Sequence, residues 1–242
     1  MLRCSICKRR NAFYVRRYSG ERLCRRCFSE SIENKVRATI SKYDLFKFDD
    51  KIAVALSGGK DSVNLLHILS KIEADYPKSS ICAITVDEGI KGYRDEAIKI
   101  ASESCEMLKV DQIIVSFKEL FGYTLDEIVE KTKNRDLTAC AYCGVLRRRA
   151  LNIAARRAGV DKIATAHTLD DEIQTFFLNL FHGDPFRILR SGPKFTSENP
   201  QFTSRVKPFC EVLERESVLY LSLIHISEPT RPLYISYAVF CL

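Results

Sequence analysis

A glycine-rich polar stretch, "ALSGGKDSV" (55–63), follows a run of strand-forming residues and has the composition of a phosphate-binding loop. Glycines let the backbone approach an anion closely, and the amides that open a following helix would point at it. A lysine and two hydroxyls add donors, and an aspartate suits phosphate through a bridging Mg²⁺. The residues that would form this site are Ser57, Gly58, Gly59, Lys60, Asp61 and Ser62. The G-x-x-x-x-G-K-[ST] spacing of the P-loop is absent, and a simple glycine turn capped by Asp or Ser is the alternative.

Four cysteines near the N-terminus have the spacing of a structural zinc site. Two C-x-x-C pairs, separated by sixteen residues, comprise Cys4, Cys7, Cys24 and Cys27. Each pair lets two thiolates reach one tetrahedral ion, and two pairs complete the ligand set with no open position. The intervening "FYVRRYSGERL" (13–23) resembles a hairpin. We therefore predict a zinc ribbon over residues 1–30 that Zn²⁺ folds, because so short a segment cannot build a core alone.

A third C-x-x-C pair, Cys140 and Cys143, has no further ligands in the local sequence. A structural zinc ion would need two more. A redox disulfide, a catalytic persulfide on one cysteine and two unliganded surface thiols all remain open for this pair.

The positive charge of the chain is concentrated at its N-terminus. The formal net charge is +7, but residues 1–27 hold nine Lys or Arg and one acid, Glu21. This basic segment indicates a polyanionic partner, nucleic acid first, with a solubilising surface as the alternative. No run of apolar residues is long enough to span a membrane and no signal peptide is supported, so a cytoplasmic protein with no membrane association is expected.

Strand-like and helix-like segments alternate through the rest of the chain. Short apolar strands are predicted over 51–57, 81–87, 111–117 and 161–167. Helices are predicted over 28–49, from Asp61 onward, and over 93–109, 125–133, 145–159 and 169–183. This order predicts an α/β fold in which helices cover both faces of a parallel sheet. The expected segments are the ribbon (1–30), a linking helix (31–50) and the nucleotide domain (51–220).

These motifs together carry a family resemblance. "SGGKDS" is similar to the pyrophosphate loop of the PP-loop ATP pyrophosphatases, which cleave ATP between its α and β phosphates and adenylate a substrate oxygen. Four further features restrict the resemblance to one group within these enzymes: the ribbon, "TVDEGIKGYRDEA" (85–97), "CAYCGVLRRR" (140–149) and "ATAHTLDDEIQTFFLNLFHGD" (164–184). In this combination the chain resembles the TtuA-type tRNA 2-thiouridine synthetases.

The resemblance implies roles for particular residues. The loop would hold the β- and γ-phosphates of ATP, and strand-end residues would read adenine or ribose. Asp170 or Asp171 would position Mg²⁺ or the activated uracil, with Lys60 and Asp61 as the other catalytic groups. The predicted ATP-binding strand-end residues are Val86, Asp87, Ala166 and His167. A satisfied core histidine is the alternative for His167, which its strand-end position beside two acids disfavours. Arg147 to Arg149 would contact ATP phosphate or tRNA, or line a solvated helix face.

For the cysteine pair, the resemblance implies a 4Fe–4S cluster held by three cysteines, among them Cys140 and Cys143, whose open iron binds the sulfide that attacks C2 of the adenylated uridine. It implies tRNA as substrate and a ubiquitin-like sulfur-carrier protein as donor, and it admits a homodimer. A tRNA 2-thiocytidine synthetase shares the loop and the cluster and is the alternative enzyme. A non-catalytic zinc-ribbon RNA-binding protein that senses ATP is the alternative outside enzymes.

The C-terminal stretch departs from the family pattern. From about residue 221, "LSLIHISEPTR" (221–231) reads as the translation of a transposase sequencing adapter, so residues 221–242 are expected to be an artefact. The third cluster cysteine expected of the family is then missing. Cys210 is a candidate substitute, but it does not fall at the family position.

Overall fold

The computed structural model describes residues 2–92, 94–132, 138–196, 199 and 201–224, so most of the adapter-like stretch lies outside the described residues. A six-stranded sheet forms the centre, in the order β5-β4-β3-β6-β8-β7. All neighbouring strands pair in parallel except β7, which is antiparallel to β8. The strands are β3 (Lys51–Ala55), β4 (Ser80–Asp87), β5 (Asp111–Ser116), β6 (Lys162–Ala164), β7 (Lys194–Phe195) and β8 (Ser204–Val206).

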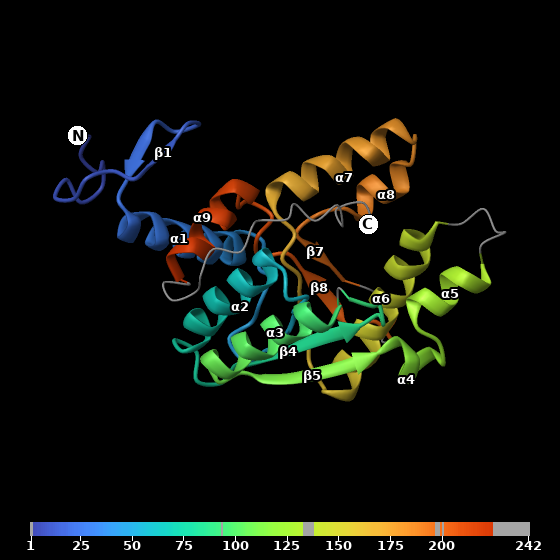
Figure 1. Ribbon diagram of the computed structural model, residues 1–242. Helices are drawn as coiled ribbons and strands as arrows, with labels where there is room; N and C mark the ends of the chain where they lie inside the picture. Colours follow the sequence, from blue (N-terminus) through green and yellow to red (C-terminus); the bar gives the residue numbers. More distant parts are fainter. Residues whose placement is uncertain (1, 93, 133–137, 197–198, 200, 225–242) are drawn as a thin grey trace.

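Alternation along β3 explains why both faces of the sheet are covered. Ile52 and Val54 belong to one buried cluster, while Ala53 between them belongs to the other. The first cluster joins the sheet to α1 (Arg25–Lys42), α2 (Lys60–Glu73), α3 (Arg94–Leu108) and α9 (Glu214–Ile224). The second joins it to α4 (Phe117–Phe121), α5 (Leu125–Lys131) and α6 (Ala139–Arg157) (Figure 1). The predicted fold class is confirmed.

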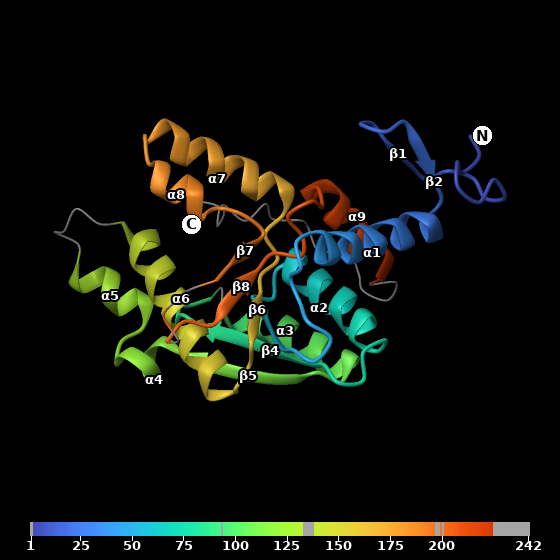
Figure 2. The same ribbon diagram turned by 180° about the vertical axis from the view of Figure 1, so that it is seen from behind.

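Two segments extend beyond this layered body. At the N-terminus, β1 (Tyr14–Arg16) and β2 (Glu21–Leu23) form an antiparallel hairpin, as predicted, and lead into α1. Further along, α7 (Leu169–Phe181) and α8 (Pro185–Arg190) pack against each other and project past the sheet (Figure 2).

The structure differs from the sequence prediction in several places. The helix predicted over 28–49 ends at Lys42, so residues 43–50 of the expected linking helix (31–50) are not helical, because Asp44 adopts a φ of +47° that no α-helix contains. The strands β7 and β8 and the helices α4, α8 and α9 were not predicted. The strand predicted over 161–167 ends at Ala164, so Ala166 and His167 lie in the following loop. The helix predicted over 145–159 begins at Ala139, because Thr138 caps it by accepting a hydrogen bond from the amide of Ala141.

Candidate functional site

The phosphate-binding stretch lies where the direction of the sheet reverses. From β3 the chain moves outward through β4 and β5, then returns to place β6 on the other side of β3. In open parallel sheets, ligands bind at the carboxyl ends of the strands at such a switch point. Residues 56–59 connect the carboxyl end of β3 to α2 at this point.

The loop has a shape that requires glycine. Gly58 has φ +82°, and a Cβ built on it would lie 2.0 Å from the carbonyl oxygen of Ala97 in α3. The Ser57 hydroxyl accepts from the amide of Gly59 at 3.2 Å and contacts the Ser62 hydroxyl at 3.1 Å. No side chain caps the N-terminus of α2 at Gly59. The tight loop therefore leads directly into helix amides that can bind an anion.

Lys60 and Asp61 form the charged part of the loop. The Lys60 ammonium lies 3.0 Å from Asp61 Oδ2 and 2.9 Å from Glu214 Oε1. Burial alone would lower the pKa of Lys60, but the two carboxylates raise it, so the ammonium is charged at neutral pH. Burial raises the pKa of Asp61 against the opposing effect of Lys60, and the charge of Asp171 raises it further.

The Asp61 carboxylate fits a Mg²⁺ ion. Its Oδ1 atom is buried and has no partner at full hydrogen-bond geometry among the described residues, although the nearby Ser217 side chain lowers the pKa of Asp61. A buried oxygen without a partner is costly, and a hard cation that bridges it to phosphate oxygens would satisfy it. Asp61 would hold the ion, which would supply charge neutralisation at the phosphates.

The strand-end residues predicted to bind ATP differ in what they contact. Val86 accepts a hydrogen bond from Arg94 through its carbonyl, and Asp87 Oδ1 accepts from the amide of Gly89 at 2.8 Å. His167 Nδ1 lies 2.9 Å from the Thr165 hydroxyl. Burial first, then the charge of Lys207, lower the pKa of His167 to about 4, so the imidazole is neutral at pH 7.

The two aspartates that open α7 make backbone contacts. Asp171 completes a capping box with Thr168, whose amide donates to Asp171 Oδ2 at 2.7 Å. Asp170 Oδ2 accepts from the amide of Glu214 at 2.7 Å. The negative charge of Asp171 raises the pKa of Asp61, so the Asp171 carboxylate lies close enough to the loop to act on it electrostatically. Asp171 is thus held rigidly near the loop, and its catalytic role stays a prediction.

The four N-terminal cysteines form one group that fits zinc. The sulfur atoms of Cys4, Cys7, Cys24 and Cys27 all lie within 4.8 Å of one another. Four thiolates at about 2.3 Å from a tetrahedral ion would be roughly 3.8 Å apart, close to this arrangement. Burial would raise the pKa of Cys4, but the backbone amides of Cys24, Cys7 and Ile6 lower it to about 6, which favours a thiolate.

The second cysteine pair lies in the first turns of α6. Cys140 is exposed and Cys143 is buried. Burial raises the pKa of Cys143, while Arg147, whose Nη2 donates to Cys143 Sγ at 3.1 Å, lowers it. Among the described residues, no third cysteine, histidine or carboxylate joins this pair in a group that could hold a metal. The pair is therefore an incomplete ligand set for a 4Fe–4S cluster, and Cys210, buried elsewhere, does not complete it.

Three residues of the site were missed by the sequence analysis. Glu88 and Arg94 are buried and joined by an ion pair of 2.8 Å, and Glu88 also binds Arg147 at 2.7 Å. Glu214 binds Lys60 from α9. Arg94 and Glu88 lie within the motif at 85–97, so their charges were visible, but only the fold shows what they bind.

The cations of the basic N-terminal segment are exposed with one exception. Arg16 is 5% exposed and binds Glu216 of α9, Glu21 and Ser31. The other cations of the segment face solvent: Arg3, Lys8, Arg9, Arg10, Arg17, Arg22, Arg25 and Arg26. Arg16 therefore fixes the ribbon to the body, and the remaining cations are available to a polyanion.

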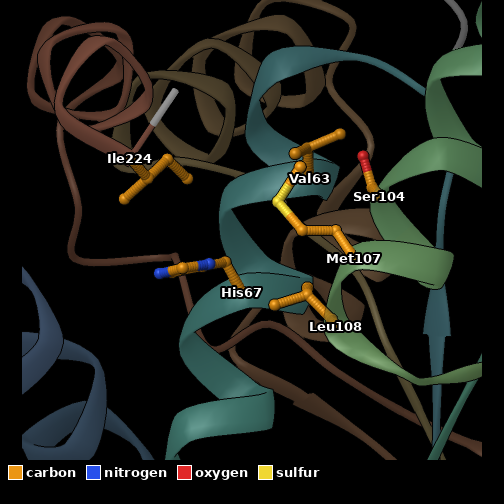
Figure 3. Close-up of a pocket in the computed structure, with 6 residues that line it drawn as sticks. All are labelled: Val63, His67, Ser104, Met107, Leu108 and Ile224. Carbon is orange, nitrogen blue, oxygen red and sulfur yellow. The ribbon is translucent and has the colours of Figure 1, made fainter. Parts of the chain in front are cut away.

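A small cavity between α2, α3 and α9 is separate from this site. It has a volume of about 20 Å³ and is lined mainly by apolar side chains, with His67 and Ser104 as polar members (Figure 3). His67 packs edge-on against Tyr220, with ring centroids 6.1 Å apart. A space of this size holds a water molecule rather than a nucleotide. His67 thus packs against α9 and lines this small cavity.

Comparison with known proteins identifies the family. A family model described as a PP-loop domain matches residues 28–225. The chain belongs to the PP-loop domain family. This PP-loop chain is 40% identical over 220 residues to cytoplasmic tRNA 2-thiolation protein 1 of Chlamydomonas reinhardtii, covering 90% of itself and 60% of that protein. It is 37% identical over 224 residues to a probable sulfurtransferase of Methanocaldococcus jannaschii, covering 91% and 65% of the two chains. It therefore spans less than two thirds of the length of these curated relatives.

Solved structures agree with this assignment. The PP-loop chain superposes on the U34-tRNA thiolase NcsA from Methanococcus maripaludis, solved with its [4Fe-4S] cluster, with a TM-score of 0.83 and 33% identity. The match covers 98% of this chain and 76% of that one. An NH3-dependent NAD synthetase from Campylobacter jejuni shares the fold alone, with a TM-score of 0.52 and 9% identity. The resemblance stated from the sequence motifs is confirmed. Within the described part of the chain, no helix has the length and apolar character to cross a membrane.

Proposed function

We propose that this chain carries the adenylating core of an ATP-dependent tRNA 2-thiolation enzyme. The observation that carries the proposal is the glycine loop at the sheet's switch point, with Lys60 and the partly unsatisfied Asp61 carboxylate beside it. The relatives named for tRNA thiolation and sulfur transfer support the substrate class.

The loop geometry suits nucleotidyl transfer with pyrophosphate as leaving group. The uridine O2 attacks the α-phosphorus of ATP as N3 loses its proton. The bond from that phosphorus to the α,β-bridging oxygen breaks, and pyrophosphate leaves with the electron pair. The α2 amides and Lys60 would stabilise that charge, and Asp61 would hold Mg²⁺ on the phosphates. A sulfur nucleophile then adds to C2, and AMP leaves with the former O2.

The cysteine pair would belong to the sulfur-transfer half of the site. Cys140 and Cys143 supply two thiols, and we propose that a third cluster ligand comes from the portion of the relatives that this chain does not span. Such a cluster would bind and deliver sulfur. Arg147 would act beside the cysteine rather than reaching freely to ATP, because Glu88 and Cys143 hold its guanidinium.

The partners follow the same proposal. The exposed cations of the ribbon would bind the phosphate backbone of tRNA. The reaction would take place in the cytoplasm, the compartment that the name of the Chlamydomonas reinhardtii relative gives for that protein. A ubiquitin-like sulfur-carrier protein as donor rests on the family resemblance. A homodimer is supported by exposed apolar side chains on α7 and α8, including Phe181, Phe186 and Leu189.

The adenylation half of the proposal is testable with this chain. Incubation with tRNA and ATP labelled at the α-phosphate should release pyrophosphate and transfer the label to tRNA, and labelled AMP should appear when sulfide or water attacks the adenylated base. Release of ADP would refute the proposed bond cleavage, and ATP binding without any turnover would favour the ATP-sensing alternative. Mass spectrometry of tRNA nucleosides from a strain that lacks the natural gene then distinguishes the bases. Loss of 2-thiouridine is expected, and loss of 2-thiocytidine would favour the alternative enzyme.

A further inference from the structure

Glu88 lies directly after β4 with its carboxylate between two arginines. Its Oε1 is 2.7 Å from Nε of Arg147, and its Oε2 is 2.8 Å from Nε of Arg94. The Glu88 side chain is only 3% exposed. A buried carboxylate is stable only when it is paired, and here each oxygen has its own cation.

Each arginine leads to a different part of the site. Arg94 Nη1 donates to the carbonyl of Ser57, the first residue of the phosphate loop, at 2.9 Å, and its Nη2 donates to the carbonyl of Val86. Arg147 Nη2 donates to Cys143 Sγ at 3.1 Å. A continuous chain of contacts therefore runs from the phosphate loop through Glu88 to the cysteine pair.

We propose that Glu88 is a positioning residue that holds Arg147 against Cys143 and, through Arg94, holds the phosphate loop. The proposal rests on the proposed function, in which the loop binds ATP and the cysteine pair serves sulfur transfer. The Arg147 guanidinium is oriented by its Nε hydrogen bond to Glu88. The Arg94 guanidinium is oriented by its two Nη hydrogen bonds, and its buried Nε makes no hydrogen bond but is held beside Glu88 by charge. One carboxylate thereby orients both halves of the site.

The two arginines should respond differently when the Glu88 charge is removed. The Arg147 side chain is 39% exposed and can turn to water. The Arg94 side chain is 6% exposed and keeps its two carbonyl acceptors, Ser57 and Val86. Glu88→Gln should therefore release Arg147 from Cys143, while Arg94 stays in place with its Nε pairing weakened.

Arginine Nε–H spectra of the ¹⁵N-labelled chain would test this directly. Arg94→Lys and Arg147→Lys assign the two signals, which should both be protected from exchange in the unaltered chain. In Glu88→Gln the Arg147 signal should lose its protection and the Arg94 signal should shift. Glu119→Gln, which removes an exposed pairing with Arg157 at 3.9 Å, is the matched control and should change neither signal.

Affinity for a non-hydrolysable ATP analogue, measured calorimetrically on cluster-free protein, is the second readout. Glu88→Gln and Arg94→Lys should weaken binding about tenfold, within the range of coupling between residues in one network. Arg147→Lys should leave it unchanged, which a loss of general stability would not predict. Glu88→Asp, which keeps the charge but shortens the side chain, replaces Glu88→Gln if that variant does not fold, and it should release Arg147 as well.

The two readouts distinguish failure of the Glu88 positioning role from failure of the proposed ATP site. An unaltered chain that binds no analogue would refute the proposed ATP site, while the arginine spectra would still decide the role of Glu88. An unaltered chain that binds the analogue, together with a Glu88→Gln variant whose affinity and Arg147 signal are unchanged, would overturn the positioning role.

Discussion

Replacing Gly58 by alanine should damage both stability and nucleotide binding, through two separable effects. The backbone at Gly58 has φ +82°, a left-handed conformation that costs an L-residue about 1–2 kcal/mol. The new Cβ would also lie 2.0 Å from the carbonyl oxygen of Ala97, where real contacts are longer than 3 Å. Since that oxygen belongs to the backbone of α3, the loop must move by roughly 1 Å, at about 1–3 kcal/mol for overpacking. The total is about 2–5 kcal/mol.

Gly122 supplies a matched control for the conformational effect. It has φ +81° and a Cβ there would meet nothing within 4 Å. Gly122→Ala should therefore cost only about 1–2 kcal/mol in urea unfolding. It should also leave ATP-analogue binding intact, whereas Gly58→Ala should weaken binding at least tenfold because the loop is displaced. Equal unfolding free energies and equal affinities for the two variants would refute the close approach of the loop to α3.

The remaining predictions concern the charged and metal-binding groups. Asp61→Asn should abolish tRNA-stimulated release of pyrophosphate from ATP, because it weakens the Mg²⁺ ligand, and it should leave the fold intact by circular dichroism; normal pyrophosphate release would remove Asp61 from the mechanism. Chelation of zinc, or Cys24→Ser, should unfold the ribbon and lower the thermal midpoint, and retained metal content would disprove the four-cysteine site. His167 has a folded pKa of about 4, below the ordinary 6.5, so the unfolded chain binds more protons between these values. Stability should therefore fall as the pH drops from about 6.5 through 4, and an unchanged slope in His167→Gln would contradict this. Replacing Arg9, Arg10 and Arg17 by Gln should lower the slope of log K for tRNA against log salt by up to about 0.9 for each phosphate that is no longer neutralised, and an unchanged slope would place the tRNA elsewhere.

The parts of the site that could be predicted from sequence are those encoded at short range. The zinc cysteines and the glycine loop are recognised from residue types and their spacing within a few positions. The capping box of Thr168 and Asp171 also joins residues that are close in sequence. The strand β8 spans three residues, Ser204–Val206, too few for a hydrophobic period to be recognised. The helix predicted from residue 145 begins six residues earlier, because Thr138 caps α6 upstream and Gly144 is buried inside the helix.

The contacts that orient the site could not be predicted, because they join distant parts of the chain. Glu88 and Arg147 are 59 residues apart, and Lys60 and Glu214 are 154 apart. A charged residue in a sequence is most simply a solvated one, and only the packing of α3, α6 and α9 brings these charges together. Arg147 illustrates the limit: its place beside the predicted cysteine pair followed from spacing, but its partners did not.

Because of the contacts of α9, tRNA binding is better tested by substituting exposed arginines than by deleting the ribbon. Glu214 binds Lys60 of the phosphate loop, and Ser217 accepts from Asn64 in α2. Two residues from Glu214, Glu216 is fully buried and binds Arg16 of the ribbon at 2.8 Å. Deleting the ribbon would leave that carboxylate buried with Lys35 at 3.2 Å as its remaining cation, at a cost of several kcal/mol, and would disturb a helix that also contacts the ATP site. A deletion would thus weaken ATP turnover even if the ribbon never touched RNA, whereas the exposed arginines can be neutralised without altering α9.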